Sequence, residues 1–282
     1  MEELRRRLPS KRRWQAFFAS YAVILVGVGL AYLFNDQEAD REVLLLLNPD
    51  VGIWLLDQAF VLVTDFSVLA FVVWAVAWEV GYQSLQVHPE WKPKLVLRYK
   101  QAGGVVGLVT AGTFAFGLYH LTATLVFLGV VLFAGFWWVA EALENRPPDD
   151  LARMNQIFWL ACLSVLLAYL GTDGVIKPIV RRPRPLSPEN AAWNGQLRLV
   201  LDEVVRDGFS YPSGHSAALF ALTTPVVLKA KRVGHKVAGF AWAALHAFSR
   251  VYLAAHFPFC ALMGSLLGFC VALAATVILT RP

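Results

Sequence analysis

The chain has 282 residues, of which 57% are hydrophobic and only 16% charged, with a formal net charge of +5. Soluble domains carry about 25% charged residues, so this composition excludes an ordinary soluble protein and favours a chain built for hydrocarbon. The lysines and arginines gather beside apolar segments, which points to membrane topology and excludes a nucleic-acid partner as the reason for the charge.

Eight apolar segments are long enough to cross a bilayer, which takes about 20 helical residues. In chain order they are about 14–34, 59–81, 102–119, 122–143, 155–176, 214–230, 236–255 and 260–280. The stretch 102–143 is too long for one span and is divided near Tyr119–Thr122. We therefore expect an all-α, polytopic transmembrane helical bundle. It would form one integral membrane domain over 1–282, with N-terminal spans in 1–154 and a functional core in 155–282.

Other features of the sequence lead to further expectations about the helices and the cysteines. The first span follows a basic N-terminus but is too long for a signal peptide and lacks a small-x-small cleavage site, so we expect it to be retained. The apolar segment 43–57 is interrupted by Asn48-Pro49-Asp50, which favours a position along the membrane interface. Gly264 and Gly268 have the small-xxx-small spacing of closely packed helices, although glycine is also simply common in membrane helices. Cys162 and Cys270 lie within spans, so no disulfide is expected.

The distribution of charged residues predicts how the chain is oriented in the membrane. Basic residues are concentrated in 1–13, 82–101 and 229–236, which eight spans place on one face, and the acidic segment 35–58 falls on the other. The positive-inside rule makes the basic face cytoplasmic, with both termini there. The 177–213 connection is basic although it should lie on the non-cytoplasmic side, and anion binding is the simplest reason for that exception.

Three motifs flank these spans on the same expected surface. Lys177 ends the fifth span, and Pro183 and Pro185 keep the following segment extended, so that Arg182 and Arg184 project from it. Arginine meets phosphate oxygens with two donors and lysine adds a compact charge. Basic residues at span ends can also simply reach lipid headgroups, which is the interpretation favoured for Arg181.

The second and third motifs supply a backbone anion site and two imidazoles. Pro212-Ser213-Gly214-His215 opens the sixth span, with Ser213 as N-cap, and a helix N-terminus with glycine is a phosphate site as readily as a capped end. Ser249 and Arg250 lie in the seventh span, where an arginine is a functional candidate. His256 follows at the outer end of that span. Together these residues can hold a phosphoryl group, attack it and protonate what leaves.

The three stretches resemble the signature of the type-2 phosphatidate phosphatase superfamily over roughly residues 155–280. That signature is Lys, six residues, Arg-Pro; then Pro-Ser-Gly-His; then Ser-Arg, five residues, His, three residues, Asp. The resemblance implies that His256 is the nucleophile and His215 the acid and later the base. It implies that Lys177, Arg184, Ser213, Gly214 and Arg250 hold the phosphate, with Arg182 as a further candidate, and that no metal or other cofactor takes part.

The chain departs from that signature at Cys260, where the family has an aspartate that would orient the nucleophilic imidazole. The segment from Ser249 to Pro258 is closely similar to that of glucose-6-phosphatases, which also lack the aspartate. A backbone carbonyl, or Glu203 or Asp207 of the preceding loop, is expected to orient His256 instead.

The sequence thus predicts a metal-independent membrane phosphatase acting on a lipid phosphate or a polyprenyl (di)phosphate through a phosphohistidine. Its partners would be the bilayer and a lipid phosphate, with no nucleic acid, and its site would face away from the cytoplasm in a multi-pass cell-membrane protein. Three alternatives remain open: a glucose-6-phosphatase-like sugar-phosphate phosphatase, a lipid phosphotransferase, and a catalytically silent lipid-phosphate binder. The oligomeric state is not predicted.

Overall fold

The computed structural model describes residues 9–48, 54–115, 119–200 and 208–280. For residues 54–56, 58–59, 62–72, 112–115 and 119–127 it describes the backbone alone. Within these ranges the chain is helical and contains no strand, apart from an isolated antiparallel bridge between Pro183 and Phe209. The predicted all-α fold is confirmed.

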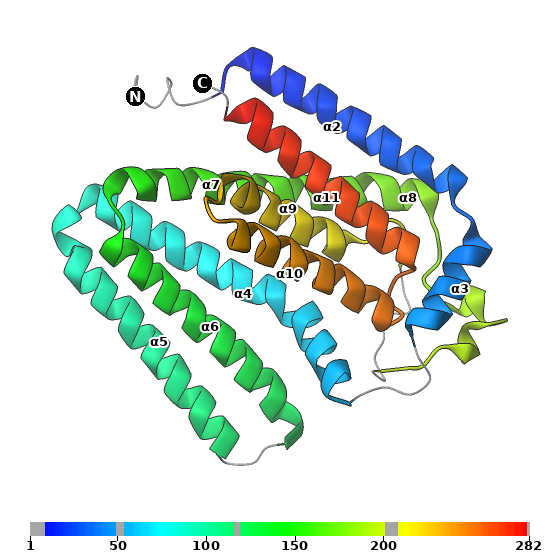
Figure 1. Ribbon diagram of the computed structural model, residues 1–282, viewed down its shortest axis with the longest axis horizontal. Helices are drawn as coiled ribbons and strands as arrows, with labels where there is room; N and C mark the ends of the chain where they lie inside the picture. The colour runs from blue at the N-terminus through cyan, green and yellow to red at the C-terminus, as the bar shows by residue number, and fades with distance from the viewer. Residues whose placement is uncertain (1–8, 49–53, 116–118, 201–207, 281–282) are drawn as a thin grey trace. The chain divides into compact units, whose positions relative to one another are not determined.

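Residues 1–60 and 159–282 form one compact unit, and residues 61–158 form a second. The expected single membrane domain over 1–282 stays a prediction. The helices of the first unit are α2 (Lys11–Ala31), α3 (Gln37–Leu47), the end of α7 (Pro148–Tyr169), α8 (Lys177–Val180), α9 (Gly214–Lys229), α10 (Val233–Tyr252) and α11 (Pro258–Leu279). Helix α11 packs beside α2 and α9, and α10 packs on α9 (Figure 1).

The second unit contains most of α4 (Trp54–Val87), then α5 (Lys92–Ala115), α6 (Tyr119–Asn145) and the start of α7. Helices α5 and α6 run side by side (Figure 1). Its core is built around Trp78, Val139, Ala140 and Leu143. The division of the apolar stretch 102–143 into two helices is therefore present, with residues 116–118 outside the described part of the chain.

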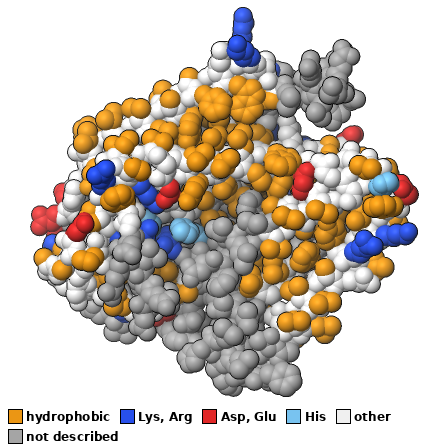
Figure 2. Space-filling view, turned by 180° about the vertical axis from the view of Figure 1, so that it is seen from behind, with side chains coloured by type: hydrophobic (Ala, Val, Ile, Leu, Met, Phe, Trp, Pro, Cys, Tyr) orange, Lys and Arg blue, Asp and Glu red, His pale blue; other side chains and the backbone are white. Residues whose placement is uncertain are grey.

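Four helical segments of the described residues are long and apolar enough to cross a membrane. They are Lys11–Phe34, Leu128–Asn145, Pro148–Val180 and Pro258–Leu279. The other four expected spans also fall in helices, namely α4, α5, α9 and α10. Apolar side chains cover much of the face seen in Figure 2, and residues such as Val23 and Ile179 are 71% and 75% exposed. Such exposure suits contact with lipid, and the count of eight spans stays a prediction.

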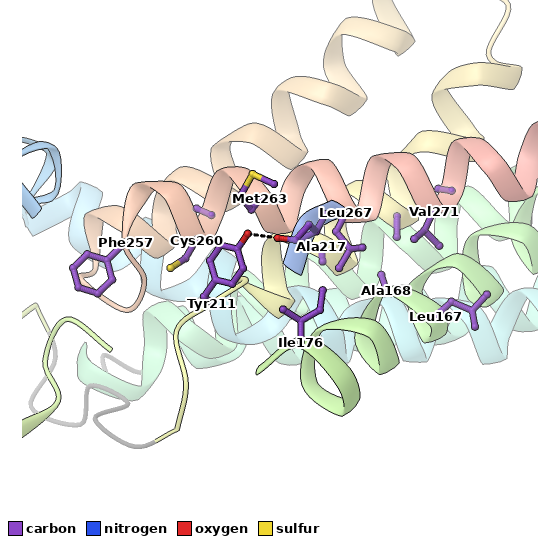
Figure 3. Packing of buried hydrophobic residues seen from close by; sticks show 14 of the residues in the cluster. Leu167, Ala168, Ile176, Tyr211, Ala217, Phe257, Cys260, Met263, Leu267 and Val271 are labelled. Carbon is purple, nitrogen blue, oxygen red and sulfur yellow. Dashed lines mark hydrogen bonds between the residues drawn. The ribbon is translucent and has the colours of Figure 1, made fainter. Parts of the chain in front are cut away.

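Buried apolar side chains of α2, α7, α9 and α11 form the core of the first unit, part of which is drawn in Figure 3. Tyr211 lies fully buried in this core, and its hydroxyl donates a hydrogen bond of 2.5 Å to the carbonyl of Val28. A buried tyrosine hydroxyl needs such a partner. This contact joins the first helix to the segment that precedes the Pro-Ser-Gly-His motif.

Helix α11 approaches the start of α9 closely because of its two glycines. A Cβ placed on Gly264 would be 2.3 Å from the carbonyl oxygen of Ser213, and one on Gly268 would be 2.0 Å from that of Ala217. Both contacts are with backbone, which cannot turn aside as a side chain can. The small-xxx-small spacing therefore reports close helix packing here, and it sets the position of the motif that begins at Pro212.

We expect Gly264→Ala to destabilise the protein and to lower any activity of the site, because the added methyl group pushes on the Ser213 backbone. Overpacking of this kind costs about 1–3 kcal/mol. The measurement is the thermal midpoint and the activity of the purified protein in detergent.

Gly29→Ala in α2 is the matched control, since a Cβ there would meet nothing within 4 Å. It should be neutral or slightly stabilising, because alanine is the better helix former. Equal behaviour of the two variants would contradict the packing role of Gly264.

Candidate active site

The first motif begins where α7 passes through a π-helical stretch, Leu170–Ile176, into α8. Such turns are frequent at functional sites. Lys177 is 9% exposed, and its Nζ lies 2.6 Å from Asp173 Oδ1. The other oxygen of Asp173 accepts a hydrogen bond of 2.8 Å from Thr172 Oγ1. The ammonium group is thus fixed by a carboxylate one helical turn earlier.

Arg181 ends α8 in the left-handed conformation, with φ 53°, and an extended segment follows. Arg182 is 4% exposed and donates from Nη1 to Asp40 Oδ2 at 2.7 Å. Its guanidinium also lies 3.8 Å from the centre of the Phe257 ring. The structure thus gives Arg182 a buried carboxylate partner, and its expected contact with phosphate stays a prediction.

Arg184 lies two residues further along the same segment and donates from Nη1 to the carbonyl of Ala255 at 3.3 Å. Burial lowers the pKa of this guanidinium, against the opposing effect of Asp173. Its Nε is buried and has no hydrogen-bond partner among the described residues. An unpaired buried cationic donor is costly, and a bound phosphate oxygen would satisfy it.

The second motif is a capped helix start placed directly against Lys177. Ser213 is fully buried, and its Oγ accepts hydrogen bonds from the backbone N–H of Ser216 at 3.3 Å and from the hydroxyl of Ser216 at 2.9 Å. A Cβ on Gly214 would lie 2.8 Å from Asp173 Oδ2 and 3.7 Å from Lys177 Nζ. Glycine therefore lets the start of α9 meet the lysine closely.

The third motif lies at the end of α10 and in the turn to α11. Arg250 is 5% exposed in the last turn of α10. His256, in the turn, is 1% exposed, and its Nδ1 lies 2.8 Å from the carbonyl oxygen of Ser210 and 3.3 Å from the Ser210 hydroxyl. A carbonyl can only accept, so Nδ1 carries the proton and Nε2 keeps its lone pair.

The electrostatic environment of His256 joins all three motifs. Burial lowers its pKa well below the ordinary value, and electrostatic interactions with Arg184, Arg250, Lys177 and His215 lower it further. Those residues therefore lie near enough to act on one imidazole. The structure brings together two histidines and three cations from segments far apart in the sequence, and it keeps His256 neutral.

Cys260 does not replace the missing aspartate as a direct partner of His256. Its thiol accepts from the Ser210 hydroxyl at 3.3 Å and from Arg182 Nη1 at 3.4 Å. The imidazole is oriented by the Ser210 carbonyl, which is the backbone alternative anticipated from the sequence. Glu203 and Asp207, the other two candidates, lie outside the described residues.

Several residues of the site were missed by sequence reasoning. Asp40 lies in α3, and besides Arg182 it accepts from the backbone N–H of Phe259 at 2.8 Å. Its segment was interpreted only as an acidic loop that reports topology. Asp173 carried a usable signal, because an acid inside a predicted span is a candidate by default and lies one turn before Lys177. Ser210 acts mainly through its backbone, which residue type does not reveal.

A second polar cluster fastens the N-terminal segment to the connection that follows the first motif. Asp57 receives two hydrogen bonds from Arg198, at 2.8 and 2.9 Å, and one from Tyr252 at 2.7 Å. Asn48 Oδ1 accepts from the N–H of Arg198 at 2.7 Å, while its Nδ2 donates to the carbonyl of Tyr252 at 2.7 Å. A bidentate pair of this kind is geometrically specific. It holds the end of α10 two residues after Arg250.

Cations and backbone groups dominate this site, and carboxylates are few. Among the described residues, no group of three or more His, Cys, Asp or Glu side chains is arranged to hold a metal ion. The cluster can instead neutralise an anion with Lys177, Arg184 and Arg250.

Comparisons with known proteins agree with the three motifs. A family profile described as the PAP2 superfamily matches residues 157–281. Lipid A 4′-phosphatase of Bacteroides thetaiotaomicron is 26% identical over 106 residues, which cover 38% of this chain and 46% of that protein. The chain therefore spans about half the length of this curated relative. No solved structure matches the chain.

The matched segment extends from α7 through the π-helical stretch and the three motifs to the end of α11. It includes every residue of the candidate site named from the sequence. Several apolar helices accompany it, as expected of a multi-pass membrane protein. Residues 157–281, somewhat less than half of the chain, thus match the PAP2 superfamily.

Proposed function

We propose that this protein is a metal-independent phosphatase of membrane lipid phosphates that works through a phosphohistidine on His256. The observation that carries the proposal is the state of that imidazole. It is buried and neutral, its Nδ1–H points at the Ser210 carbonyl, and its neighbours are cations. A nucleophile needs a free lone pair aimed at a bound electrophile, and this arrangement leaves Nε2 for that purpose.

Phosphate binding is assigned to the cations and to the start of α9. The Nε of Arg184 has no hydrogen-bond partner among the described residues, and Lys177 lies beside Gly214. The first N–H groups of a helix such as α9 are typical phosphate donors. At the transition state of phosphoryl transfer, charge is spread over the equatorial phosphate oxygens and develops on the leaving oxygen. Fixed cations aimed at these oxygens stabilise that charge without reorganisation. Asp173, now paired with Lys177, would share that lysine with the substrate.

The reaction divides into two displacements. In the first, Nε2 of His256 forms a bond to phosphorus, the bond from phosphorus to the lipid oxygen breaks, and His215 gives that oxygen a proton. In the second, water attacks the phosphohistidine, His215 takes a proton from the water, and the nitrogen–phosphorus bond breaks. Inorganic phosphate leaves, and both histidines return to their starting states. A covalent step of this kind replaces one high barrier with two lower ones.

A lipid substrate is favoured because the phosphate cluster belongs to a bundle of apolar helices. The relative in Bacteroides thetaiotaomicron is named for a lipid substrate, lipid A. The positive-inside pattern of the sequence favours cytoplasmic termini and a site on the opposite face of the membrane. Polyprenyl (di)phosphate and phosphatidate are further members of the same substrate class.

A substrate panel on the purified protein tests the proposal. In detergent with EDTA present, we expect inorganic phosphate from lipid A, phosphatidate or a polyprenyl diphosphate at least about tenfold faster than from glucose-6-phosphate. The reason is that burial of an apolar tail contributes to binding. Loss of activity in EDTA would contradict the metal-independent mechanism.

Other outcomes of the panel identify the alternatives. Preference for glucose-6-phosphate would indicate a sugar-phosphate phosphatase. Phosphate recovered in a lipid or sugar product would indicate a phosphotransferase. Binding of lipid phosphate without any release of phosphate would indicate a silent binder.

A further inference from the structure

A cavity of about 350 Å³ lies beside the candidate active site and is not used by the mechanism above. Its lining is mixed: the residues are Gln37, Glu38, Arg41, Arg182, Pro183, Asn190, Trp193 and Phe257. The volume falls in the range of small-ligand pockets, about 300–1,000 Å³. Helix α3 contributes one wall, and the two segments next to the catalytic candidates contribute the other. We call it the α3 pocket.

The chain segments that line the α3 pocket also carry residues of the candidate active site. Pro183 directly precedes Arg184, and Phe257 directly follows His256. Asn190 is tied to the same segment, because its Nδ2 donates to the carbonyl of Arg184 at 2.6 Å. The α3 pocket therefore lies next to the two segments that carry Arg184 and His256.

The pocket has an aromatic wall. The rings of Trp193 and Phe257 have centroids 5.9 Å apart and are tilted by 48°. The guanidinium of Arg41 lies 5.6 Å from the centre of the Trp193 ring. Large rigid rings beside a cation suit a flat or ring-shaped group that has both C–H and polar surface.

Polar groups surround that wall with both kinds of hydrogen-bonding capacity. Gln37 and Asn190 each offer amide donors and an acceptor, and Glu38 accepts only. Arg41 Nε is buried and has no hydrogen-bond partner among the described residues. A buried donor without a partner is unusual, and a ligand oxygen in the α3 pocket would supply the acceptor.

This mixture distinguishes between lipid phosphates. In phosphatidate and in polyprenyl phosphates the phosphate is the end of the molecule, and the remainder is mostly hydrocarbon. Such a substrate has no hydroxyl-rich group to fill a second polar pocket. A lipid that carries its phosphate on a sugar ring has one, with C–H faces for Trp193 and hydroxyls for Glu38 and Asn190.

Resting on the proposed phosphatase function, we propose that the α3 pocket binds the sugar of a saccharide-borne lipid phosphate. Trp193 stacks on the ring, and Arg41 binds an oxygen of the sugar or of a second anionic group on it. The pocket thereby makes the enzyme specific for phosphorylated glycolipids over phosphatidate.

The test compares kcat/KM for two probes in the same mixed micelles: a phosphorylated glucosamine-disaccharide lipid and phosphatidate. For Trp193→Ala and for Arg41→Gln we expect a loss of about tenfold or more with the glycolipid, the scale of one stacking or charge-assisted contact. Phosphatidate hydrolysis should change less than about threefold, because that substrate does not enter the pocket. Trp193→Phe should keep most of the activity toward the glycolipid.

The matched control is Glu189→Gln, an exposed neighbour of Asn190 that does not line the pocket. This variant should leave kcat/KM unchanged for both substrates. Equal losses with both probes, or a wild-type preference for phosphatidate, would overturn the pocket proposal while leaving the phosphatase proposal intact.

If the wild-type protein hydrolyses neither probe, the proposed phosphatase function is contradicted, but the proposal for the α3 pocket is not yet tested by that result. Equilibrium binding of the disaccharide lipid to the same variants then tests the pocket. Weaker binding to Trp193→Ala and Arg41→Gln than to Glu189→Gln supports it, and equal binding overturns it.

Discussion

Replacing His256 with asparagine is expected to lower turnover of a lipid phosphate by at least about 10⁴-fold, the scale seen when a covalent nucleophile is removed from a preorganised site. Asparagine can still donate a hydrogen bond to the Ser210 carbonyl from near the position of Nδ1. It has no atom in the place of Nε2, so the phosphorus–nitrogen bond cannot form. The measurement is single-turnover release of inorganic phosphate from the lipid substrate.

Substrate affinity should survive in the same variant, because Lys177, Arg184 and Arg250 remain in place. Equilibrium binding of the intact lipid phosphate is therefore expected within about threefold of the wild type, since ground-state binding and transition-state stabilisation are separate quantities. The control is His235→Asn, which changes an exposed histidine in the first turn of α10. Near-normal turnover in His256→Asn would show that the nucleophile lies elsewhere.

The parts of the fold that follow from residue type were predictable. Apolar segments of membrane length become helices because only a helix satisfies its own backbone in hydrocarbon. Lys177, Gly214 and His256 were named because each has a chemical property that few other residues share. Their convergence needed no further information than the order of spans and motifs. Helix α3 was not predicted as an element, since 43–57 was interpreted as a single interfacial segment.

The contacts that orient the site were much less predictable. Asp40 pairs with Arg182 across 142 residues of sequence, and Asn48 bonds to Arg198 and Tyr252 across still longer separations. No periodicity encodes such contacts. Ser210 holds His256 through a backbone carbonyl group, which every residue possesses. The residue type therefore could not predict this contact. Long-range polar partners and backbone acceptors are therefore the features that required the structure.

Cys260 stands where the family signature has an aspartate, and the surrounding contacts differ accordingly. An aspartate at this position would add a carboxylate beside His256, whereas the thiol carries no such charge and contacts Ser210 and Arg182 instead. Helix α11 offers Arg182 no carboxylate at this position. Arg182 instead pairs with Asp40 of α3, with 2.7 Å between Nη1 and Oδ2. A buried guanidinium that loses its partner is strongly destabilising, by about 3–5 kcal/mol. Helix α3 is thus fixed against the site by an acid that lies outside the matched family segment.

Replacing His215 with asparagine is expected to produce a loss that depends on the leaving group. For a lipid alcohol, which leaves poorly unless it is protonated, turnover should fall by about 10²–10⁴-fold, the usual contribution of a general acid. For nitrophenyl phosphate, whose phenolate leaves without a proton, the first displacement should be nearly normal. Burst kinetics of nitrophenol release at several enzyme concentrations measure this difference.

The second displacement gives the sharper result. His215 is also the base that activates water, so His215→Asn should stop after one nitrophenol per site and accumulate an acid-labile, base-stable phosphoenzyme. The double variant His215→Asn/His256→Asn should accumulate none, because the nitrogen that forms the covalent bond is gone. An equal loss for both leaving groups, with no trapped phosphoenzyme, would assign His215 to phosphate binding alone. Proton transfer and covalent capture are thereby separated within one pair of histidines.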